Sequence, residues 1–358
     1  MRFRYDTSYR QSGRLLRGPR EWLPYAALVA VLAVLPWVLP SYYIDEATYL
    51  FILAIASLGL MIVTGYTGQV SLGHAAFLAI GAYAHAWFLS HGVPLVASLA
   101  LAALLAGACG FVIGLPAIRV SGLYLAMVTL AFASIVEQVV GNWKAVTGGY
   151  SGTAVPSPSL FGIDLSSSTR LYGLCLVILV LVLVALVNLM RSKTGRAFAG
   201  IRQSEAAANA LGIWVAGYKV LAFVISAAIT GLAGGLLAHQ LQFLTPDGFT
   251  VVQSIELLLM VVIGGLGSLR GAIFGAIVIG LLPTFISGIK PMLPPKIAAQ
   301  FGLDIFVYGA ILGFFVLFEP LGLNGRWRRA KAALAEFPLH RAQRHRRVKS
   351  YMKSERYR

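Results

Sequence analysis

The feature that most limits what this chain can fold into is a series of long uncharged apolar runs. The run Leu171–Met190, for example, contains no charged residue. A helix rises about 1.5 Å per residue and the hydrocarbon layer of a bilayer is about 30 Å thick, so about 20 apolar residues make one membrane span. Only 12% of the residues are charged, against about 25% in soluble domains. The sequence therefore predicts an all-α integral membrane protein built as a bundle of transmembrane helices.

Apolar runs of this kind recur along the whole chain. The expected spans are 24–40, 47–64, 71–91, 94–118, 121–141, 170–190, 219–241, 251–266, 270–289 and 300–318. This makes about ten transmembrane helices, an even number that places both ends of the chain on the same side. The runs at 71–91 and 251–266 are the least certain, so eight or nine spans are the alternative.

The positions of the basic residues predict the orientation. With ten spans, all but four of the 29 Lys and Arg residues fall on one side of the membrane. Lys and Arg are retained on the cytoplasmic side, so we expect a multi-pass membrane protein with both termini in the cytoplasm. The chain then divides into a basic arm (1–23), a transmembrane domain (24–320) and a basic tail (321–358). Basic ends of this kind are attracted to anionic lipid.

Two polar stretches separate the spans most widely. The stretch 142–169 falls outside and is rich in Gly, Ser and Pro, which predicts turns. The stretch 191–219 falls inside and carries five basic residues and the single acid Glu205. Its segment Arg202–Ala210 is rich in helix-forming residues, and Gly212 is a plausible helix stop. We expect a short cytoplasmic helix there, outside the bilayer.

This inner loop resembles the EAA loop of ABC importer permeases, which docks into a groove on the ATPase subunit. The resemblance rests on a Glu-Ala-Ala triplet followed by a glycine, and the alternative is an ordinary solvated connecting helix. The ATPase-coupling candidates are Arg202, Glu205, Ala206, Ala207 and Gly212. The chain contains no G-x-x-x-x-G-K-[ST] motif, so ATP and Mg²⁺ are expected on a partner subunit and no cofactor on this chain.

Glycine interrupts the apolar pattern in two places, 65–74 and 264–271. Broken helix geometry inside a membrane is tolerated only where protein or a water-filled pathway covers it, so both places are candidates for the translocation route. The alternative is close packing of helices through small residues. The pathway candidates are Gly65, Gly68, Gln69, Ser71, Gly73, Gly264, Gly265 and Gly267. Aligning Ser71 with Ser268 also brings several neighbouring residues into register, which suggests an internal duplication.

Few ionisable side chains lie within the expected spans. Glu137 and Glu256 are two acids within the spans, each four or five residues from an expected outer end, and both are candidates for an outer mouth that meets an ammonium group. The alternative is that each carboxylate simply reaches the water at the headgroups. His74 is expected to be a packed, hydrogen-bonded core residue. Cys109 and Cys175 show no metal-ligand spacing, so no metal site is expected.

Longer segments resemble one family, the M-type (LivM-type) permease subunit of branched-chain amino acid ABC importers. The matching segments are GYTGQVSLGHAAFLAIGAY (65–83), SGLYLAMVTLAFASI (121–135), VTGGYSGTAVP (146–156), GIRQSEAAANALGI (200–213), YKVLAFVISAAITGLAGGL (218–236) and SIELLLMVVIGGLGSLRGAIFGA (254–276). They follow the order of the family over most of the chain between Gly65 and Gly322.

The resemblance implies a partner permease subunit of related sequence (LivH-like), two ATPase subunits and an external, periplasmic substrate-binding protein. It also implies ATP-driven import of Leu, Ile or Val, with urea or short amides as the alternative cargo. The same resemblance implies that 24–320 is a permease domain and that the chain lies in the bacterial inner (plasma) membrane. Two other function classes are less well supported. A secondary transporter driven by an ion gradient is compatible with the broken helices, whereas a membrane enzyme is not indicated because H-E-x-x-H and G-x-S-x-G motifs are absent.

Overall fold

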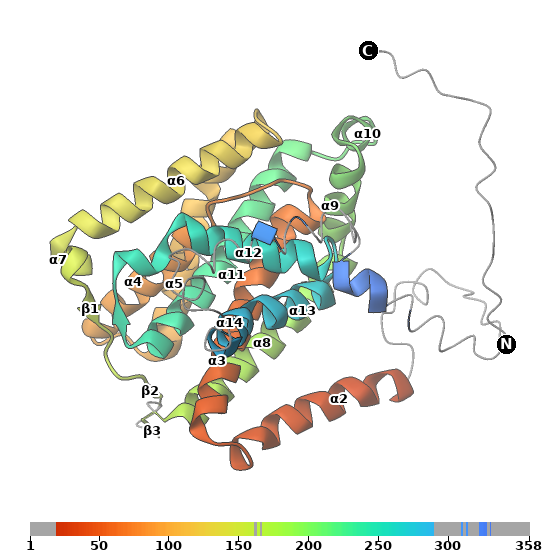
Figure 1. The fold of residues 1–358 in the computed structure, drawn as a ribbon. Coiled ribbons are helices and arrows are strands. Elements are labelled where there is room, and N and C mark those ends of the chain that lie inside the picture. The colour runs from red at the N-terminus through yellow and green to blue at the C-terminus, as the bar shows by residue number, and fades with distance from the viewer. Residues whose placement is uncertain are drawn as a thin grey trace.

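The computed structural model describes residues 19–160, 163–164 and 167–289, together with 309, 310, 313, 322–327 and 330. These residues form a bundle of long apolar helices, which confirms the predicted all-α membrane fold (Figure 1). Helices α9 and α10 lie at one end of the bundle, and α7 and the short strands β1 to β3 lie at the other. We call these the α10 end and the β1 end.

The helices keep the order expected from the sequence. They are α2 (Pro19–Val34), α3 (Ser41–Leu60), α4 (His74–Ser90), α5 (Leu95–Gly114), α6 (Leu123–Asn142), α7 (Lys144–Thr147), α8 (Ser168–Arg191), α9 (Lys193–Gln203), α10 (Glu205–Ala210), α11 (Val215–Leu241), α12 (Val251–Gly264), α13 (Leu269–Gly280) and α14 (Leu282–Ile289). Tighter 3₁₀ turns are η1 (Leu35–Trp37), η3 (Pro116–Ile118), η4 (Gly149–Ser151) and η5 (Pro246–Phe249), and η2 (Met61–Tyr66) is a π-helical turn that continues α3.

Seven helical stretches among the described residues are long and apolar enough to cross a membrane. They are Ser41–Tyr66, Leu95–Gly114, Leu123–Asn142, Ser168–Arg191, Val215–Leu241, Pro246–Gly264 and Leu269–Ile286. Helix α4 has 17 residues and falls just short of that length. The expected span 300–318, the arm 1–23 and the tail 321–358 lie wholly or mostly outside the described residues. The count of ten spans therefore stays a prediction.

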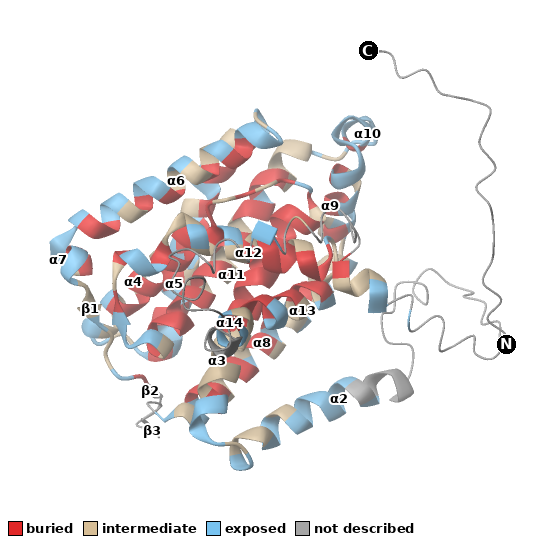
Figure 2. Ribbon diagram, viewed as in Figure 1, coloured by how far each residue is buried: buried red, intermediate tan, exposed pale blue. Residues whose placement is uncertain are grey.

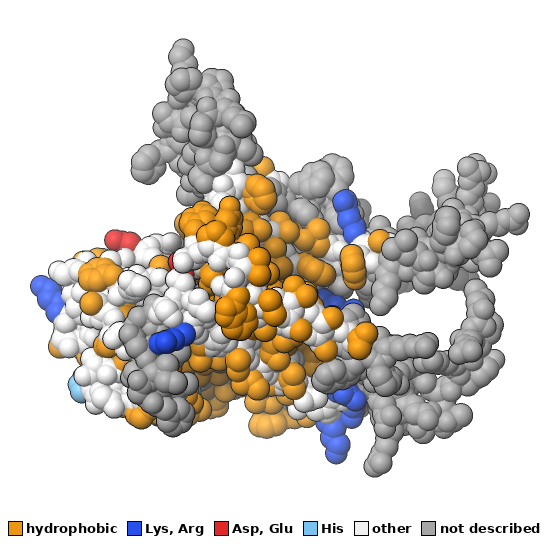
Figure 3. Space-filling model, turned by 90° about the horizontal axis from the view of Figure 1, so that it is seen from below, with side chains coloured by type: hydrophobic (Ala, Val, Ile, Leu, Met, Phe, Trp, Pro, Cys, Tyr) orange, Lys and Arg blue, Asp and Glu red, His pale blue; other side chains and the backbone are white. Residues whose placement is uncertain are grey.

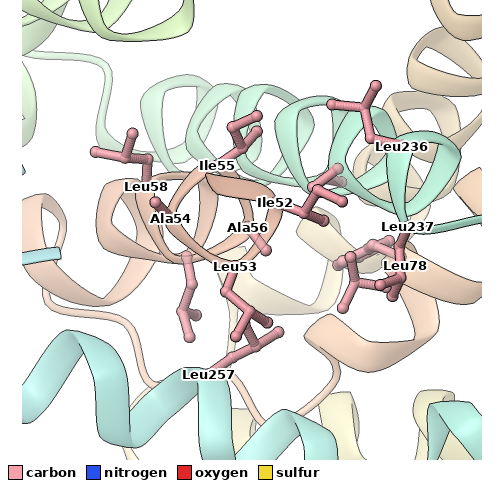
Figure 4. Close-up of a cluster of buried hydrophobic side chains, with 14 of the residues drawn as sticks. Ile52, Leu53, Ala54, Ile55, Ala56, Leu58, Leu78, Leu236, Leu237 and Leu257 are labelled. Carbon is pink, nitrogen blue, oxygen red and sulfur yellow. The ribbon is translucent and has the colours of Figure 1, made fainter. Parts of the chain in front are cut away.

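Helices α3 and α11 form the centre of the bundle. Their apolar side chains pack with those of α4 and α12 into one continuous core (Figure 4). Small residues let the backbones approach closely: a Cβ added to Gly81 of α4 would overlap the carbonyl of Gly231 in α11. Figure 2 shows the buried residues concentrated in these central helices, whereas α2 and α6 expose much of their surface.

The expected outer loop 142–169 contains little regular secondary structure, as its composition predicts. It contains α7, η4 and two-residue strands, of which β1 (Thr153–Ala154) pairs with β4 (Phe243–Leu244) and β2 (Ser159–Leu160) pairs with β3 (Ile163–Asp164). The pairing of β1 with β4 joins this loop to the segment that follows α11. That long-range contact was not expected from the sequence.

The surface agrees with a membrane location. In Figure 3, hydrophobic side chains cover the middle of the face that is shown, and the Lys and Arg side chains lie toward its two ends. Many large apolar side chains are exposed on α5, α6 and α8, including Leu104, Ile135 and Leu181. An apolar belt of this kind is what lipid contact requires.

Candidate functional site

The inner loop folds into two short helices rather than the single helix expected over Arg202–Ala210. Helix α9 ends at Gln203 and α10 begins at Glu205, because the side chain of Ser204 caps α10 by accepting from the backbone N–H of Ala207 at 3.2 Å. Serine at a cap competes for the backbone groups that a continuous helix would use. The loop 191–219 is therefore mostly helical.

Gly212 ends α10, as predicted. Its φ of +81° is left-handed, and its N–H donates to the carbonyl of Asn209 at 2.9 Å. The N–H of Ile213 donates to the carbonyl of Ala208 at 3.0 Å, which completes the two-bond helix stop known as the Schellman motif. Most of α10 is exposed, including Ala206 and Ala207 (Figure 2). The loop thus presents a well-capped helix at the surface.

Helix α9 anchors this exposed helix to the bundle. Phe198 and Ile201 are buried, and the ring of Phe198 meets that of Tyr218 on α11 edge-on, with 6.2 Å between centroids. The side chain of Ser192 caps α9 by accepting from the N–H of Thr194 at 3.1 Å. A displacement of α10 would therefore be passed to α9 and to the start of α11.

Glu205 forms an ion pair with Lys219, whose ammonium Nζ lies 2.7 Å from the carboxylate. The sequence placed Lys219 among the exposed loop charges, but helix α11 begins earlier than expected and buries it to 3% exposure. Its Nζ also donates to the carbonyl of Ala117 at 3.4 Å. A buried ammonium group needs such partners, because an unpaired one is strongly destabilising. The pair fastens α10 to α11.

Arg202 connects the inner loop to both glycine breaks. Its Nη1 donates to the carbonyl of Gly65 at 2.5 Å, at the end of the π-helical turn η2. A Cβ added to Gly68 would lie 3.4 Å from the Arg202 side chain, and one added to Gly267 would overlap the guanidinium. Gly68 and Gly267 also have positive φ angles. Glycine is therefore required at both positions by backbone conformation and, at Gly267, by the space that Arg202 occupies.

The two breaks also contact each other directly. The N–H of Gly267 points at the sulfur of Met61 at 3.3 Å, and a Cβ added to Gly65 would lie 2.9 Å from the nitrogen of Gly267. Two segments about 200 residues apart in the sequence thus meet at the side chain of Arg202. The structure brings together Arg202, Gly65, Gly68 and Gly267 from two candidate sets that the sequence had left separate.

The first break is held by side-chain hydrogen bonds. Ser71 Oγ lies 2.9 Å from His74 Nδ1, and His74 Nε2 lies 2.7 Å from Ser226 Oγ. Ser226 donates to the carbonyl of Gly59 at 2.6 Å, so it accepts from His74 Nε2–H, and Ser71 in turn donates to Nδ1. The fully buried His74 is a hydrogen-bonded core residue, as predicted.

Two further hydrogen bonds fix the start of α4. The N–H of Leu72 donates to Thr129 Oγ1 of α6, and the N–H of Ala75 donates to Ser254 Oγ of α12, both at 2.9 Å. A Cβ added to Gly73 would lie 2.5 Å from the carbonyl oxygen of Thr129. Backbone N–H groups at the break are therefore satisfied by two neighbouring helices, α6 and α12, as a membrane interior requires.

Gln69 differs from the rest of this break. It is 3% exposed, and neither atom of its side-chain amide has a hydrogen-bond partner among the described residues. A buried amide without partners is costly, which makes this residue a candidate for a contact formed in another conformation or with a bound molecule.

The second break is a tight turn between α12 and α13. A Cβ added to Gly264 would overlap the carbonyl of Gly271, and one added to Gly275 would overlap the carbonyl of Met260. Gly265 has a φ of +111°, and Ser268 caps α13 by accepting from the N–H of Gly271 at 3.2 Å. This break is therefore held by backbone packing.

The two acids lie on different helices, away from Arg202. Glu137 is half-buried on α6, in the turn before the short helix α7 at the β1 end. Glu256 is half-buried in the second turn of α12. Their assignment to an outer mouth stays a prediction. Within the described residues, no group of three or more His, Cys, Asp or Glu side chains is placed to hold a metal ion.

Sequence reasoning missed one polar cluster. His85 Nε2 and His239 Nε2 lie 2.8 Å apart, and His85 Nδ1 lies 2.9 Å from Ser98 Oγ. His85 lies within the expected span 71–91, and its partner lies 154 positions later. Histidines near the same expected end of two spans were the available signal.

Known proteins resemble this chain in sequence over most of its length. A family model described as "branched-chain amino acid transport system / permease component" matches residues 42–316. The chain belongs to this family. The match contains both glycine breaks and the whole inner loop, so the contacts around Arg202 lie within the part of the chain that defines the family. No solved structure matches the chain.

Individual relatives are permease proteins of branched-chain amino acid transport systems. The chain is 37% identical over 279 residues to the high-affinity permease protein LivM of Salmonella typhimurium, covering 71% of this chain and 65% of that protein. It is 36% identical over 286 residues to LivM of Escherichia coli K12, covering 73% and 67%. It is 27% identical over 296 residues to LivH of Escherichia coli K12, covering 76% and 91%. The chain thus matches about two thirds of the length of the LivM proteins.

Proposed function

We propose that this chain is the membrane-spanning permease subunit of an ATP-driven importer that carries Leu, Ile and Val into the cytoplasm. Membership of the permease family and the names of the LivM and LivH relatives support this assignment. The partners would be a second, LivH-like permease subunit, two ATPase subunits that hold ATP and Mg²⁺, and an external substrate-binding protein. The chain itself is a transport subunit that catalyses no reaction.

The observation that carries the proposal is the position of Arg202. Exposed α10 offers Ala206 and Ala207 to a soluble partner, and Arg202, three residues before Glu205, reaches the two glycine breaks. A partner that moved α10 would therefore move the guanidinium that lies between Gly65 and Gly267. An ordinary solvated connecting helix has no need of such a contact.

The proposed mechanism has three steps. Closure of the ATPase subunits displaces α10, and the Glu205–Lys219 ion pair carries this displacement to α11. Arg202 carries it to the turns after α3 and α12. Helix α4 then reorients at the turn after α3, while α12 and α13 shift together, and these movements change the side from which the pathway is open.

The remaining candidates are assigned to the pathway. Gly65, Gly68, Ser71 and Gly73 would form a turn that borders the pathway and changes its shape. Gly264, Gly265 and Gly267 would form a rigid turn that also borders it. Gln69 would find partners for its amide in the other conformation. Glu137 and Glu256 stay candidates for an outer mouth, where a carboxylate attracts the ammonium group of an amino acid.

The experiment that tests the function starts with affinity purification of the tagged full-length chain in mild detergent. The recovered complex is placed in vesicles and assayed for ATP-dependent uptake of labelled leucine and of labelled urea. Co-purification of an ATPase with uptake of leucine supports the proposal. Uptake of urea instead would retain the transporter class and replace the cargo, whereas transport by the lone chain without ATP would overturn it.

Two variants test the coupling role. Replacing Gly212 with Ala, or replacing both members of the ion pair (Glu205→Gln together with Lys219→Met), is expected to reduce ATP-driven uptake while the protein still folds. In these variants α10 loses its helix stop or its tie to α11, and no buried ammonium group is left unpaired. Lys193→Ala, at the start of α9, is the control. The coupling role is wrong if both variants retain full uptake and full ATPase association.

A further inference from the structure

A cavity of about 460 Å³ lies at the β1 end of the bundle, away from Arg202. Four segments enclose it: the start of α3, the loop after β1, the start of α8 and the end of α11. Its lining residues are Asp45, Val155, Pro156, Ser157, Pro158, Ser168, Leu171, His239, Gln240 and Gln242. This volume is within the range of about 300–1,000 Å³ that small-molecule sites occupy. In the expected orientation the cavity faces the outside.

The lining of the cavity contains an acidic group, hydrogen-bond donors and apolar side chains. Asp45 supplies the one carboxylate among the lining residues, and no lysine or arginine lines the cavity. The amides of Gln240 and Gln242 and the hydroxyls of two serines offer hydrogen-bond donors. Valine, proline and leucine side chains complete the wall. A ligand with an ammonium group, a carboxylate and an aliphatic side chain would match all three.

Gln242, at the wall of the cavity, has an unusual backbone conformation. Its φ is +61°, and it is the one residue other than glycine with a positive φ among the described residues. Its N–H closes α11 on the carbonyl of Ala238, and its own carbonyl accepts from the N–H of Val155, both at 2.9 Å. Glycine would adopt this conformation without strain. A residue other than glycine that is kept in a strained backbone conformation at a cavity wall points to a function for its side chain, here the amide of Gln242.

Neighbouring contacts fix the other side of the cavity. Gln240 Nε2 donates to the backbone carbonyl of Asp45 at 3.2 Å, which joins α11 to the start of α3. His239 is 5% exposed and bonds through Nε2 to His85. Ser98 donates to the carbonyl of Leu95, so it accepts from His85 Nδ1, and His85 Nε2 then accepts from His239 Nε2–H. This leaves Nδ1 of His239, a residue that lines the cavity, as a hydrogen-bond acceptor.

We propose that this cavity binds a free aliphatic α-amino acid. The carboxylate of Asp45 and Nδ1 of His239 receive the ammonium group, the Gln242 amide and the Ser168 hydroxyl donate to the ligand carboxylate, and Val155, Pro156 and Leu171 contact the aliphatic chain. The choice of solute rests on the proposed transport function. The chain itself would then select for the cargo, in addition to any external binding protein.

The first test measures equilibrium binding of labelled L-leucine to the full-length chain in lipid nanodiscs, without ATPase. Competition uses 3-methylbutylamine, which lacks the carboxylate, and 4-methylpentanoate, which lacks the ammonium group. We expect each to compete about tenfold more weakly than leucine, because each loses one charged hydrogen-bonded group. Equal competition by the amine would show a simple cation site and overturn the proposal, as would the absence of leucine binding.

Variants assign the binding to this cavity. Asp45→Asn is expected to weaken leucine binding about tenfold or more. The matched control is Glu46→Gln, because Glu46 is the adjacent carboxylate, is bonded to Thr284 Oγ1 at 3.1 Å and does not line the cavity. Gln242→Gly is expected to weaken binding without lowering the unfolding temperature, since glycine accepts the same φ. Wild-type affinity in both cavity variants would overturn the proposal.

A second measurement is independent of those variants. Ser157→Cys places a thiol at the cavity, and L-leucine is expected to slow its reaction with a water-soluble maleimide, whereas urea is not. Ser90→Cys, at the β1 end but outside the cavity, controls for general effects. Unchanged reactivity in saturating leucine would contradict the site.

The two proposals fail differently. ATP-driven uptake of leucine by the complex, without leucine binding in the cavity, would leave the transport function and remove this site. Binding in the cavity without ATP-driven uptake would leave the site and remove the transport function.

Discussion

The two glycine breaks meet beneath the same arginine but are held by different forces. The first, after α3, is held by hydrogen bonds from the side chains of Thr129, Ser226 and Ser254. The second, between α12 and α13, is held by contact between backbones, with Gly264 against Gly271. The first break therefore depends mainly on polar groups supplied by other helices, in addition to the close approach of Gly73 to the Thr129 carbonyl. The second depends mainly on the absence of side chains.

This difference indicates which break changes shape. A hydrogen bond contributes only about 1 kcal/mol net and can be exchanged for another, so the first break can be remade in a new arrangement. Close packing of backbones admits no such exchange. We infer that α12 and α13 move together as a rigid hairpin, whereas the turn between α3 and α4 changes its conformation.

The largest expected effect is in the packed break. Gly264→Val would force the new side chain into the Gly271 carbonyl and separate α12 from α13, at a cost of about 3 kcal/mol. Thermal unfolding of the purified protein in detergent measures the loss. Gly173→Val on α8, where an added Cβ meets nothing within 4 Å, is the matched control. Equal unfolding temperatures for the two variants would contradict the comparison.

A smaller loss is expected in the hydrogen-bonded break. His74→Leu keeps the approximate volume but removes the ring between Ser71 and Ser226, which should lower the free energy of unfolding by about 2 kcal/mol. His91→Leu, at an exposed histidine, should leave the unfolding temperature nearly unchanged. If both variants unfold alike, the polar network does not hold the break.

Removal of a single hydrogen bond tests the contribution of one contact in the same network. Thr129→Val leaves the N–H of Leu72 without its acceptor, which should cost about 1 kcal/mol. Hydrogen exchange should become faster at the Leu72 amide and remain unchanged along α13. Ser134→Ala, exposed on the same helix and bonded to Leu130 of its own helix, is the control. Protection of Leu72 equal to wild type would argue against this contact.

The smallest effect on stability is expected where the breaks meet. Arg202→Ala removes an exposed side chain and its hydrogen bond to the Gly65 carbonyl. The free energy of unfolding should fall by only about 0.5 kcal/mol, the low end for a hydrogen bond, because water can replace an exposed donor. ATP-driven uptake should nevertheless fall about tenfold or more, because the loop no longer contacts either break. Arg196→Ala, on the same helix but bonded to Arg191, should transport normally. Normal uptake by the Arg202 variant would remove the link between the loop and the breaks.

The fold class and family could be predicted from the sequence because both depend on local patterns. Apolar length identifies a span, and proline and glycine set its ends within a few residues. The expected span 94–118 shows the limit: α5 ends at Gly114, because Pro116 lacks the N–H that would continue the helix. Likewise, α3 begins at Ser41 directly after Pro40, although Asp45 and Glu46 suggested a later start.

Contacts between distant segments could not be predicted in the same way. Nothing in the local pattern shows that Lys219 is buried, that His85 meets His239, or that Arg202 reaches Gly65. Each contact depends on which helices become neighbours. Each candidate set was therefore visible in the sequence, but the relation between the sets required the structure.

The π-helical turn Met61–Tyr66 gives α3 one residue more than a regular helix needs over the same length. This extra residue allows the helix to change its length and rotation without breaking. If the turn relaxed to ordinary pitch, the residues after it would rotate by about 100° and shift by about 1.5 Å along the axis. The Gly65 carbonyl would then swing away from Arg202 while the helix kept its ladder of hydrogen bonds. Helix α3, at the centre of the bundle, can therefore rotate by the equivalent of one residue without unfolding.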